Sequence, residues 1–284
     1  MRFRLASVLV LLAVLSVGCS GLEPIIDARS EVVEFQSVDL PGRLWDPFMP
    51  DIDSGEAVTI TGTLRIPATE TPVPAVIIAH GCGGIGGAEL SWVPVLEELG
   101  VASFVVDSFG GRGIGNICTG RETINVLSPV VDVFRAASIL EADPYIDGAR
   151  IAVMGFSFGG RAAIWTGFDR FRDAYDGRAL SAHLAFYPST CYIELADEGF
   201  GSAPLRIFHG VEDNWTPIDP CEELVERLAG DGADAELFDY PDAGHSFDNP
   251  GLAWGLEHLS VSALSPRSCT FVEIDGEIID PDTG

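Results

Sequence analysis

One serine in this sequence lies in a setting that suggests chemistry. Ser157 is the centre of G-F-S-F-G at 155–159, after an apolar run of strand type at 151–154 and before a segment of helical character. This is the nucleophile-elbow pattern, in which a tight strand-to-helix turn exposes a serine hydroxyl at the edge of a sheet. Glycine suits 155 and 159 because a β-carbon would collide there as the helix packs back on the strand. Ser157 is therefore the predicted nucleophile.

A serine hydroxyl needs a base to attack at neutral pH, and a histidine held by a carboxylate can supply it. The elbow pattern alone can arise by chance in a chain with 32 glycines, so these partners decide its meaning. His245 lies in D-A-G-H-S-F, directly after a predicted strand, and is the predicted base. Among the other downstream histidines, His183 lies within a predicted strand and is interpreted as structural. His209 ends a strand and His258 belongs to the last predicted helix, so neither lies on a free loop.

The carboxylate is expected between the serine and the histidine in the chain. H-G-V-E-D-N-W-T-P follows a predicted strand at 205–209 and offers Glu212 and Asp213. Asp213 is preferred because D-x-x-x-P places its carboxylate at the strand tip, where Pro217 fixes the turn; Glu212 is the fallback. In a chain with 43 acidic residues either one could be an ordinary loop carboxylate, and the spacing favours the functional interpretation.

Two backbone amides must face the negative charge that develops on an attacked carbonyl oxygen. One is expected from Phe158, the residue after the nucleophile. The other is expected from Cys82, in the glycine-rich loop H-G-C-G-G-I-G-G at 80–87 that follows a predicted strand. The same glycines would also suit a simple tight turn, and both interpretations can hold together.

Strand-like and helix-like segments alternate along most of the chain. Strands are predicted at 32–38, 58–66, 74–79, 102–107, 151–154, 182–187, 205–209 and 235–240, and helices near 92–99, 129–143, 220–229 and 252–264. This alternation predicts an α/β fold with a mostly parallel central sheet and helices on both faces. In such a sheet the loops beyond the carboxyl ends of the strands gather at one edge, which would bring the candidate residues together.

Composition limits the class of protein. A length of 284 residues suits one large α/β domain or two small ones, and 47% apolar content is enough for a sizeable core. The formal net charge is −27, and all 16 basic residues are arginine. Such a surface repels nucleic acid and anionic lipid headgroups, so neither is an expected partner. Neither C-x-x-C nor H-x-x-x-H occurs, so we expect no metal site.

The first residues are typical of an export signal. Arg2 and Arg4 precede an apolar core at 5–17, and small residues lead to Cys19. L-S-V-G-C-S resembles a bacterial lipobox, which predicts a lipoprotein signal peptide at 1–18, lipidation of Cys19 and a place in the cell envelope. The lipid anchor would be the contact with the membrane, because the apolar run is short for a transmembrane helix. An ordinary cleaved signal peptide is the alternative.

Export would place the other cysteines in an oxidising compartment, where pairing is favoured. Cys82 and Cys118 follow consecutive predicted strands, and so do Cys191 and Cys221. We therefore predict the disulfides Cys82–Cys118 and Cys191–Cys221, with Cys269 left over.

Three segments are expected after the signal. Residues 19–28 form a short tether and residues 29–265 the α/β-hydrolase domain. The tail at 266–284 contains Asp275-Gly276 between β-type residues, which is typical of a small hairpin.

Over roughly Val58 to Leu264 the sequence resembles the dienelactone hydrolase family of α/β-hydrolases, through A-H-G-C-G-G, V-V-D-S-F-G-G-R-G, M-G-F-S-F-G-G, H-G-V-E-D-N-W-T-P and A-G-H-S-F. The resemblance implies hydrolysis of a carboxylic ester or lactone without a metal or organic cofactor. The namesake enzymes carry cysteine where this chain has Ser157 and glutamate where it has Gly81, so their thiol activation does not transfer. Arg112 lies near a family arginine that binds a substrate carboxylate; pairing with a surface acid is an equal alternative.

Three hypotheses follow. The first is an exported, lipid-anchored serine esterase with a triad of Ser157, His245 and Asp213, acting on a small ester or lactone. The second is a serine peptidase similar to the prolyl oligopeptidase catalytic domain, which has the same order of residues. The third is a non-catalytic envelope lipoprotein on a hydrolase scaffold. Aromatic residues beside the triad are candidates for the wall of an acyl pocket, although they could equally be core: Phe156, Trp215 and Phe247.

Overall fold

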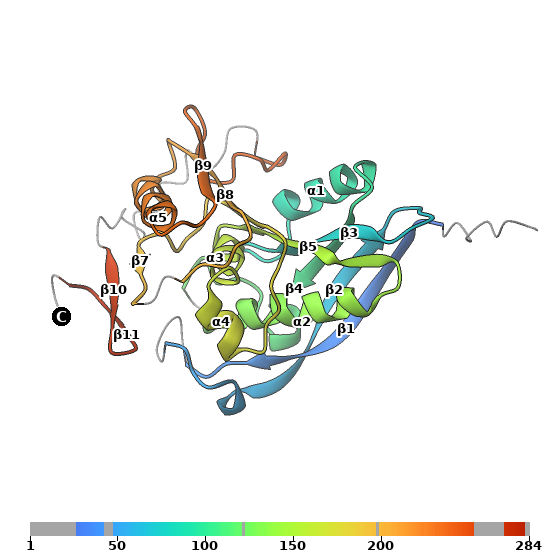
Figure 1. Ribbon diagram of the computed structural model, residues 1–284, viewed down its shortest axis with the longest axis horizontal. Coiled ribbons are helices and arrows are strands. Elements are labelled where there is room, and N and C mark those ends of the chain that lie inside the picture. Colours follow the sequence, from blue (N-terminus) through green and yellow to red (C-terminus); the bar gives the residue numbers. More distant parts are fainter. Residues whose placement is uncertain (1–26, 43–47, 121–122, 197–198, 253–269, 282–284) are drawn as a thin grey trace, which may run out of the picture.

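The computed structural model describes residues 27–42, 48–120, 123–196, 199–252 and 270–281. At its centre is an eight-stranded sheet in the order β1-β2-β4-β3-β5-β6-β8-β9 (Figure 1). Its strands are β1 (Arg29–Asp39), β2 (Glu56–Ile66), β3 (Val73–Ala79), β4 (Ala102–Asp107), β5 (Ile146–Phe156), β6 (His183–Phe186), β8 (Leu205–Gly210) and β9 (Ala235–Tyr240). Each overlaps a predicted strand.

The sheet is antiparallel at one edge and parallel elsewhere. β1 pairs with β2, and β2 with β4, in antiparallel register. Every pairing from β4 through β3, β5, β6 and β8 to β9 is parallel. The carboxyl ends of the parallel strands therefore meet at one edge, and the loops beyond them carry the candidate residues. The predicted α/β fold with a mostly parallel sheet is confirmed.

Helices cover both faces of the sheet. On one face lie α2 (Ser128–Ala142), α3 (Phe158–Trp165) and α5 (Asp219–Gly230), and on the other lies α1 (Gly87–Glu98). Strand β3 serves both cores, because successive side chains point to opposite faces: Ile77 packs in the first core and Val76 and Ile78 in the second. A strand buried on both faces is a continuous apolar run, as at 74–79.

Some elements differ from the expectation. The helix expected from residue 92 begins at Gly87, because Glu89 in its first turn accepts a hydrogen bond from the backbone of Gly86. Four short elements carry too little pattern to predict: η1 (Ile52–Ser54), η2 (Gly110–Arg112), α4 (Asp169–Ala174) and β7 (Ile193–Glu194). The helix expected at 252–264 lies, apart from Leu252, outside the described residues. Within the described ranges no helix combines the length and apolar character of a membrane span.

The C-terminal segment forms a hairpin that docks on the domain. β10 (Phe271–Ile274) and β11 (Glu277–Ile279) pair antiparallel, and both turn residues have positive φ, 52° at Asp275 and 83° at Gly276. β10 also pairs in parallel with β7. An ion pair joins Glu273 to Arg170 of α4, with 2.7 Å between Oε1 and Nη2.

Two disulfides link neighbouring loops. Cys82 is bonded to Cys118 and Cys191 to Cys221, which confirms both predicted pairs. The predictions for the signal peptide, for lipidation of Cys19, for most of the tether and for Cys269 and His258 concern residues outside the described ranges.

Candidate active site

Ser157 occupies a strained turn between β5 and α3. Its backbone φ is 51° and its ψ is −107°, a combination that residues with a side chain rarely adopt. A β-carbon at Gly155 would lie 2.0 Å from the carbonyl oxygen of Gly159, and one at Gly159 would lie 2.2 Å from that of Ala79. Both positions therefore require glycine, and the helix can approach the sheet closely enough to present the serine hydroxyl at its edge.

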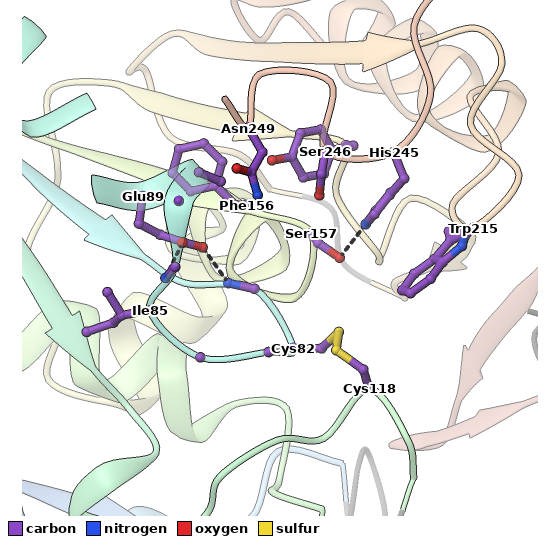
Figure 2. A pocket seen from close by; sticks show the side chains of 17 residues that line it. Cys82, Ile85, Glu89, Cys118, Phe156, Ser157, Trp215, His245, Ser246 and Asn249 are labelled. Atoms are coloured by element: carbon purple, nitrogen blue, oxygen red, sulfur yellow. Dashed lines mark hydrogen bonds between the residues drawn. A yellow bond between two sulfur atoms is a disulfide. The ribbon is translucent and has the colours of Figure 1, made fainter. Parts of the chain in front are cut away.

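The structure brings the three predicted residues together in a hydrogen-bonded chain. Ser157 Oγ lies 3.0 Å from His245 Nε2 (Figure 2), and His245 Nδ1 lies 2.7 Å from Asp213 Oδ2. They come from the ends of β5, β9 and β8, which adjoin the same edge of the sheet. With the Nδ1 proton donated to the carboxylate, Nε2 is left to accept the proton of the serine hydroxyl.

Asp213 is held as a carboxylate. Its Oδ1 accepts the amides of Trp215 at 2.8 Å and Thr216 at 3.0 Å, and its Oδ2 accepts the Thr216 hydroxyl at 2.9 Å. Burial alone would raise the pKa of Asp213, but the hydrogen bonds from His245 and the Thr216 amide outweigh it and keep the pKa below its ordinary value. The fallback Glu212 is exposed, which leaves Asp213 as the partner of the imidazole.

The imidazole of His245 lies between two aromatic rings. The Tyr187 ring is 4.7 Å away between centroids, and the Trp215 ring stacks on the imidazole at 5.3 Å with 18° between planes. The loop that carries His245 is anchored through Asp248, which accepts hydrogen bonds from the Tyr187 hydroxyl at 2.7 Å and from Trp92 Nε1 at 2.9 Å. These contacts fix the orientation of the ring against Ser157.

The two amides predicted to bind an oxyanion belong to Phe158, within the elbow, and to Cys82, in the glycine-rich loop after β3. Phe158 is the first residue of α3, so its N–H has no acceptor within the helix. Cys82 lines the pocket with Ser157 and His245, and in Figure 2 its disulfide to Cys118 lies on the other side of Ser157 from the imidazole. The geometry leaves an attacked carbonyl room between the serine and this loop.

A cavity of about 240 Å³ opens beside Ser157. Phe156 and Trp215 line it, as predicted for a pocket wall. Phe247 does not: its ring packs on Tyr187 at 5.8 Å and on Tyr240 at 4.6 Å, so that prediction is wrong. The reason is that Phe247 follows the histidine by two residues, and the turn at Ser246 (φ 60°) directs it back to the sheet.

Arg112 does not reach the cavity, and its predicted role in binding a substrate carboxylate is wrong. Its side chain is 1% exposed and forms a two-pronged pair with Asp132, at 2.8 Å and 2.9 Å. It also donates to the carbonyl oxygens of Ser108 and Val38 and approaches Asp39 at 3.3 Å. These contacts hold the guanidinium inside the fold, so Arg112 does pair with an acid, although its main partner Asp132 is buried and not on the surface.

His183 and His209 are buried in the interior of the fold. Burial lowers the pKa of His183 to about 4, and its Nδ1 lies 3.0 Å from the carbonyl oxygen of Ala163. Burial also lowers the pKa of His209. Among the described residues, no group of three or more His, Cys, Asp or Glu side chains could hold a metal ion.

Sequence reasoning missed several residues that shape the site. Thr216 could have been found, because it lies three residues after Asp213 in the same turn. Tyr187, Asn249 and Glu89 also line the cavity or contact the loops around it, and no local pattern marks them. Their place depends on how three separate loops meet.

Known proteins of related sequence include two bacterial ones. The chain is 26% identical over 233 residues, or 69% of its length, to the uncharacterized peptidase YuxL of Bacillus subtilis strain 168, of which this covers 35%. It is 30% identical over 113 residues, 38% of its length, to the esterase FrsA of Klebsiella pneumoniae, of which this covers 25%. The chain therefore matches about a third or less of the length of these relatives.

Solved structures match over a larger share. The dienelactone hydrolase-like promiscuous phosphotriesterase P91 from metagenomic libraries has a TM-score of 0.57 at 18% identity, covering 78% of this chain and 87% of that one. Dienelactone hydrolase from Anabaena variabilis has a TM-score of 0.53 at 19% identity, covering 78% and 91%. These likenesses show an α/β-hydrolase fold. The sequence profile of the dienelactone hydrolase family matches residues 60–258, more than half of the chain. The protein belongs to the dienelactone hydrolase family.

Proposed function

We propose that this protein is a serine hydrolase that cleaves carboxylic esters or lactones through an acyl-enzyme on Ser157. The observation that carries the proposal is the unbroken chain from Ser157 through His245 to Asp213 at the wall of a cavity. A buried carboxylate, a positioned imidazole and a strained serine turn are the parts that acyl transfer requires.

The reaction follows from the geometry. Ser157 Oγ attacks the acyl carbon while His245 Nε2 takes its proton, and the ionised Asp213 stabilises the imidazolium that forms. The amides of Phe158 and Cys82 bind the oxyanion of the tetrahedral intermediate. The imidazolium then gives its proton to the leaving alkoxide. Water, activated by the same imidazole, releases the acid and restores the serine.

The size and lining of the cavity favour small substrates. About 240 Å³ is little room for a long acyl chain, and Phe156 and Trp215 give the wall an aromatic character. With Arg112 paired inside the fold, the hypothesis that it binds an anionic substrate group loses its support. Short, uncharged esters are therefore the expected substrates.

The place of action is a separate part of the proposal. The export signal at 1–18 and the lipobox at Cys19 support a lipid-anchored protein of the cell envelope. Two disulfides in one domain support an oxidising compartment. The acidic surface argues against nucleic acid as a partner.

A serine peptidase is the second candidate. The match to a Bacillus protein named as a peptidase, over 69% of this chain, favours it. The same triad can cleave an amide, so turnover of peptide amides without turnover of esters would select this function.

The test is hydrolysis of short p-nitrophenyl esters by the purified protein and by Ser157→Ala. We expect the parental protein to turn over acetate and butyrate esters and the variant to lose at least about 10³-fold in kcat. Thr166→Ala is the matched control for losing a hydroxyl in a folded protein, because Thr166 is buried at the C-terminal end of α3. Equal rates for the parental protein and Ser157→Ala would end the proposal.

A further inference from the structure

One buried carboxylate at the cavity takes no direct part in the proposed acyl transfer. Glu89, in the first turn of α1, is 4% exposed and lines the cavity. Its two oxygens accept hydrogen bonds from opposite ends of the glycine-rich loop: Oε1 from the amide of Gly81 at 3.0 Å and Oε2 from the amide of Gly86 at 2.8 Å (Figure 2). A buried carboxylate is costly unless such donors satisfy it, so both bonds are needed.

The loop that Glu89 spans contains the amide of Cys82. The preceding carbonyl, that of Gly81, accepts hydrogen bonds from His80 Nδ1 at 2.8 Å and from the amide of Gly84 at 3.1 Å. A trans peptide is planar, with its C=O and N–H pointing in opposite directions, so these bonds fix the direction of the Cys82 N–H.

The bonds around this peptide hold it on every side. Glu89 fixes the Gly81 amide before it, the amide of Ile117 donates to the Cys82 carbonyl at 2.9 Å after it, and Cys118 holds the Cys82 side chain. His80 can donate from Nδ1 because its Nε2 accepts the amide of Ser108 at 3.2 Å. Within this arrangement Glu89 bonds to both ends of the loop.

We propose that Glu89 is a positioning residue that sets the Cys82 amide for the oxyanion. The inference rests on the proposed function. The positioning role requires a side chain with two acceptor oxygens, because Gly81 and Gly86 each present an N–H. Glutamine keeps the size of the side chain but offers one acceptor, and its NH₂ group would face the second amide. Glu89→Gln therefore loosens one end of the loop and leaves the helix in place.

The test compares Glu89→Gln and Glu89→Ala with Glu98→Gln, which removes a charge from the exposed side of the same helix. Loss of an oxyanion donor lowers kcat by about 10²–10³-fold, so a misdirected one should lower it by about tenfold or more. We expect Glu89→Gln to show that fall in kcat with KM within about twofold, and Glu89→Ala a larger one. Glu98→Gln should match the parental protein.

A second readout separates positioning from general disturbance. Ser157 Oγ adds to the carbonyl carbon of a trifluoromethyl ketone, and the serine proton passes to His245. The ketone oxygen becomes an oxyanion that faces the amides of Phe158 and Cys82. The affinity of the ketone should fall in Glu89→Gln by the same factor as kcat/KM, whereas the affinity of the product acid should not change. Thermal unfolding and near-ultraviolet circular dichroism verify that the variant is folded.

An unchanged kcat in Glu89→Gln would overturn the inference, and so would a fall in kcat with unchanged affinity for the ketone. Either result would leave the proposed function intact, since the parental protein would still hydrolyse esters through Ser157. Failure of the proposed function would instead appear as parental protein without ester hydrolysis.

Discussion

Two buried carboxylates near the same sheet have different partners. Asp132 is fully buried and pairs with Arg112 through both of its oxygens, and Ser37 donates to it as well. Asp213 is buried against His245. The guanidinium of Arg112 keeps its proton at any ordinary pH, so the pair with Asp132 stays an ion pair. The imidazole of His245 can gain and lose a proton. His245 Nε2, the nitrogen that does not face Asp213, is within hydrogen-bond distance of the Ser157 hydroxyl at the wall of the cavity.

The difference shows what distinguishes a reactive pair from a structural one. Burial and a charged partner are common to both. What differs is an exchangeable proton that faces a space a substrate can enter. The comparison predicts that changes at Asp213 act on turnover and changes at Asp132 act on stability.

The largest effect is expected from Asp213→Asn. The amide cannot hold the imidazole in the tautomer that leaves Nε2 free, and it cannot stabilise the imidazolium, so kcat for a short ester should fall by about 10³–10⁴-fold. Steady-state kinetics measures the change, and thermal unfolding verifies the fold. A loss of less than tenfold would mean that Asp213 resembles Asp132 in its role.

Asp132→Asn should act on stability instead. It leaves Arg112 as a buried charge without its main partner, which costs about 3–5 kcal/mol in the free energy of unfolding. Urea unfolding measures this, and kcat of the folded variant should match the parental value. Asp147→Asn, whose pair with Arg150 lies near the surface, is the control and should leave the midpoint unchanged. A large loss of kcat with parental stability in Asp132→Asn would contradict the comparison.

His183 is a buried titratable group away from the cavity, so its protonation should alter stability alone. Burial lowers its pKa from 6.5 to about 4. Between these values the unfolded chain binds a proton that the folded protein does not, so the free energy of unfolding falls as the pH falls. The loss is at most about 3 kcal/mol, at about 1.4 kcal/mol per pH unit.

Thermal unfolding of the parental protein and of His183→Gln from pH 7 to pH 4 measures this contribution. The variant should lose less stability than the parental protein over that range. His209 is present in both proteins, so its own contribution does not affect the difference. Identical pH profiles would contradict the prediction.

The two disulfides offer a second comparison, for which the smallest change in kcat is expected. They close loops of similar length, with sequence separations of 36 and 30 residues, so their loss should cost similar stability. Cys82–Cys118 borders the cavity, whereas Cys191–Cys221 does not line it. Cys118→Ser should therefore lower kcat several-fold and Cys221→Ser should not, when both are assayed well below their unfolding temperatures. Equal effects on kcat would show that the bridge at the cavity has no part in turnover.

The residues that could be predicted are those whose type the chemistry dictates. Ser157, Asp213 and His245 each follow a strand, and parallel strands bring such positions to one edge whatever the details of the loops. The fold was predictable for the same reason, because a strand buried on both faces is apolar throughout. Gly155 and Gly159 could also be interpreted from the local sequence, since the close approach of α3 to β5 and to the end of β3 leaves no room for a β-carbon at either position.

The residues that could not be predicted depend on the direction of a side chain. Arg112 has a suitable type and a nearly suitable position, but its side chain points inward to Asp132, which lies 20 residues later in the sequence. The Phe247 ring also points away from the cavity, because it packs on Tyr187 and Tyr240. Glu89 lies before the helix predicted near 92–99, where no pattern marks it, and its role is visible only once the loop at 81–86 is folded over its carboxylate.

Labelling with a fluorophosphonate, followed by mass spectrometry of the intact protein and of its peptides, tests the central claim most directly. The account predicts one adduct per chain, formed with loss of fluoride and located on Ser157, and no adduct in Ser157→Ala. Ester hydrolysis should disappear in step with labelling. An adduct on another residue, or hydrolysis that persists in fully labelled protein, would contradict it.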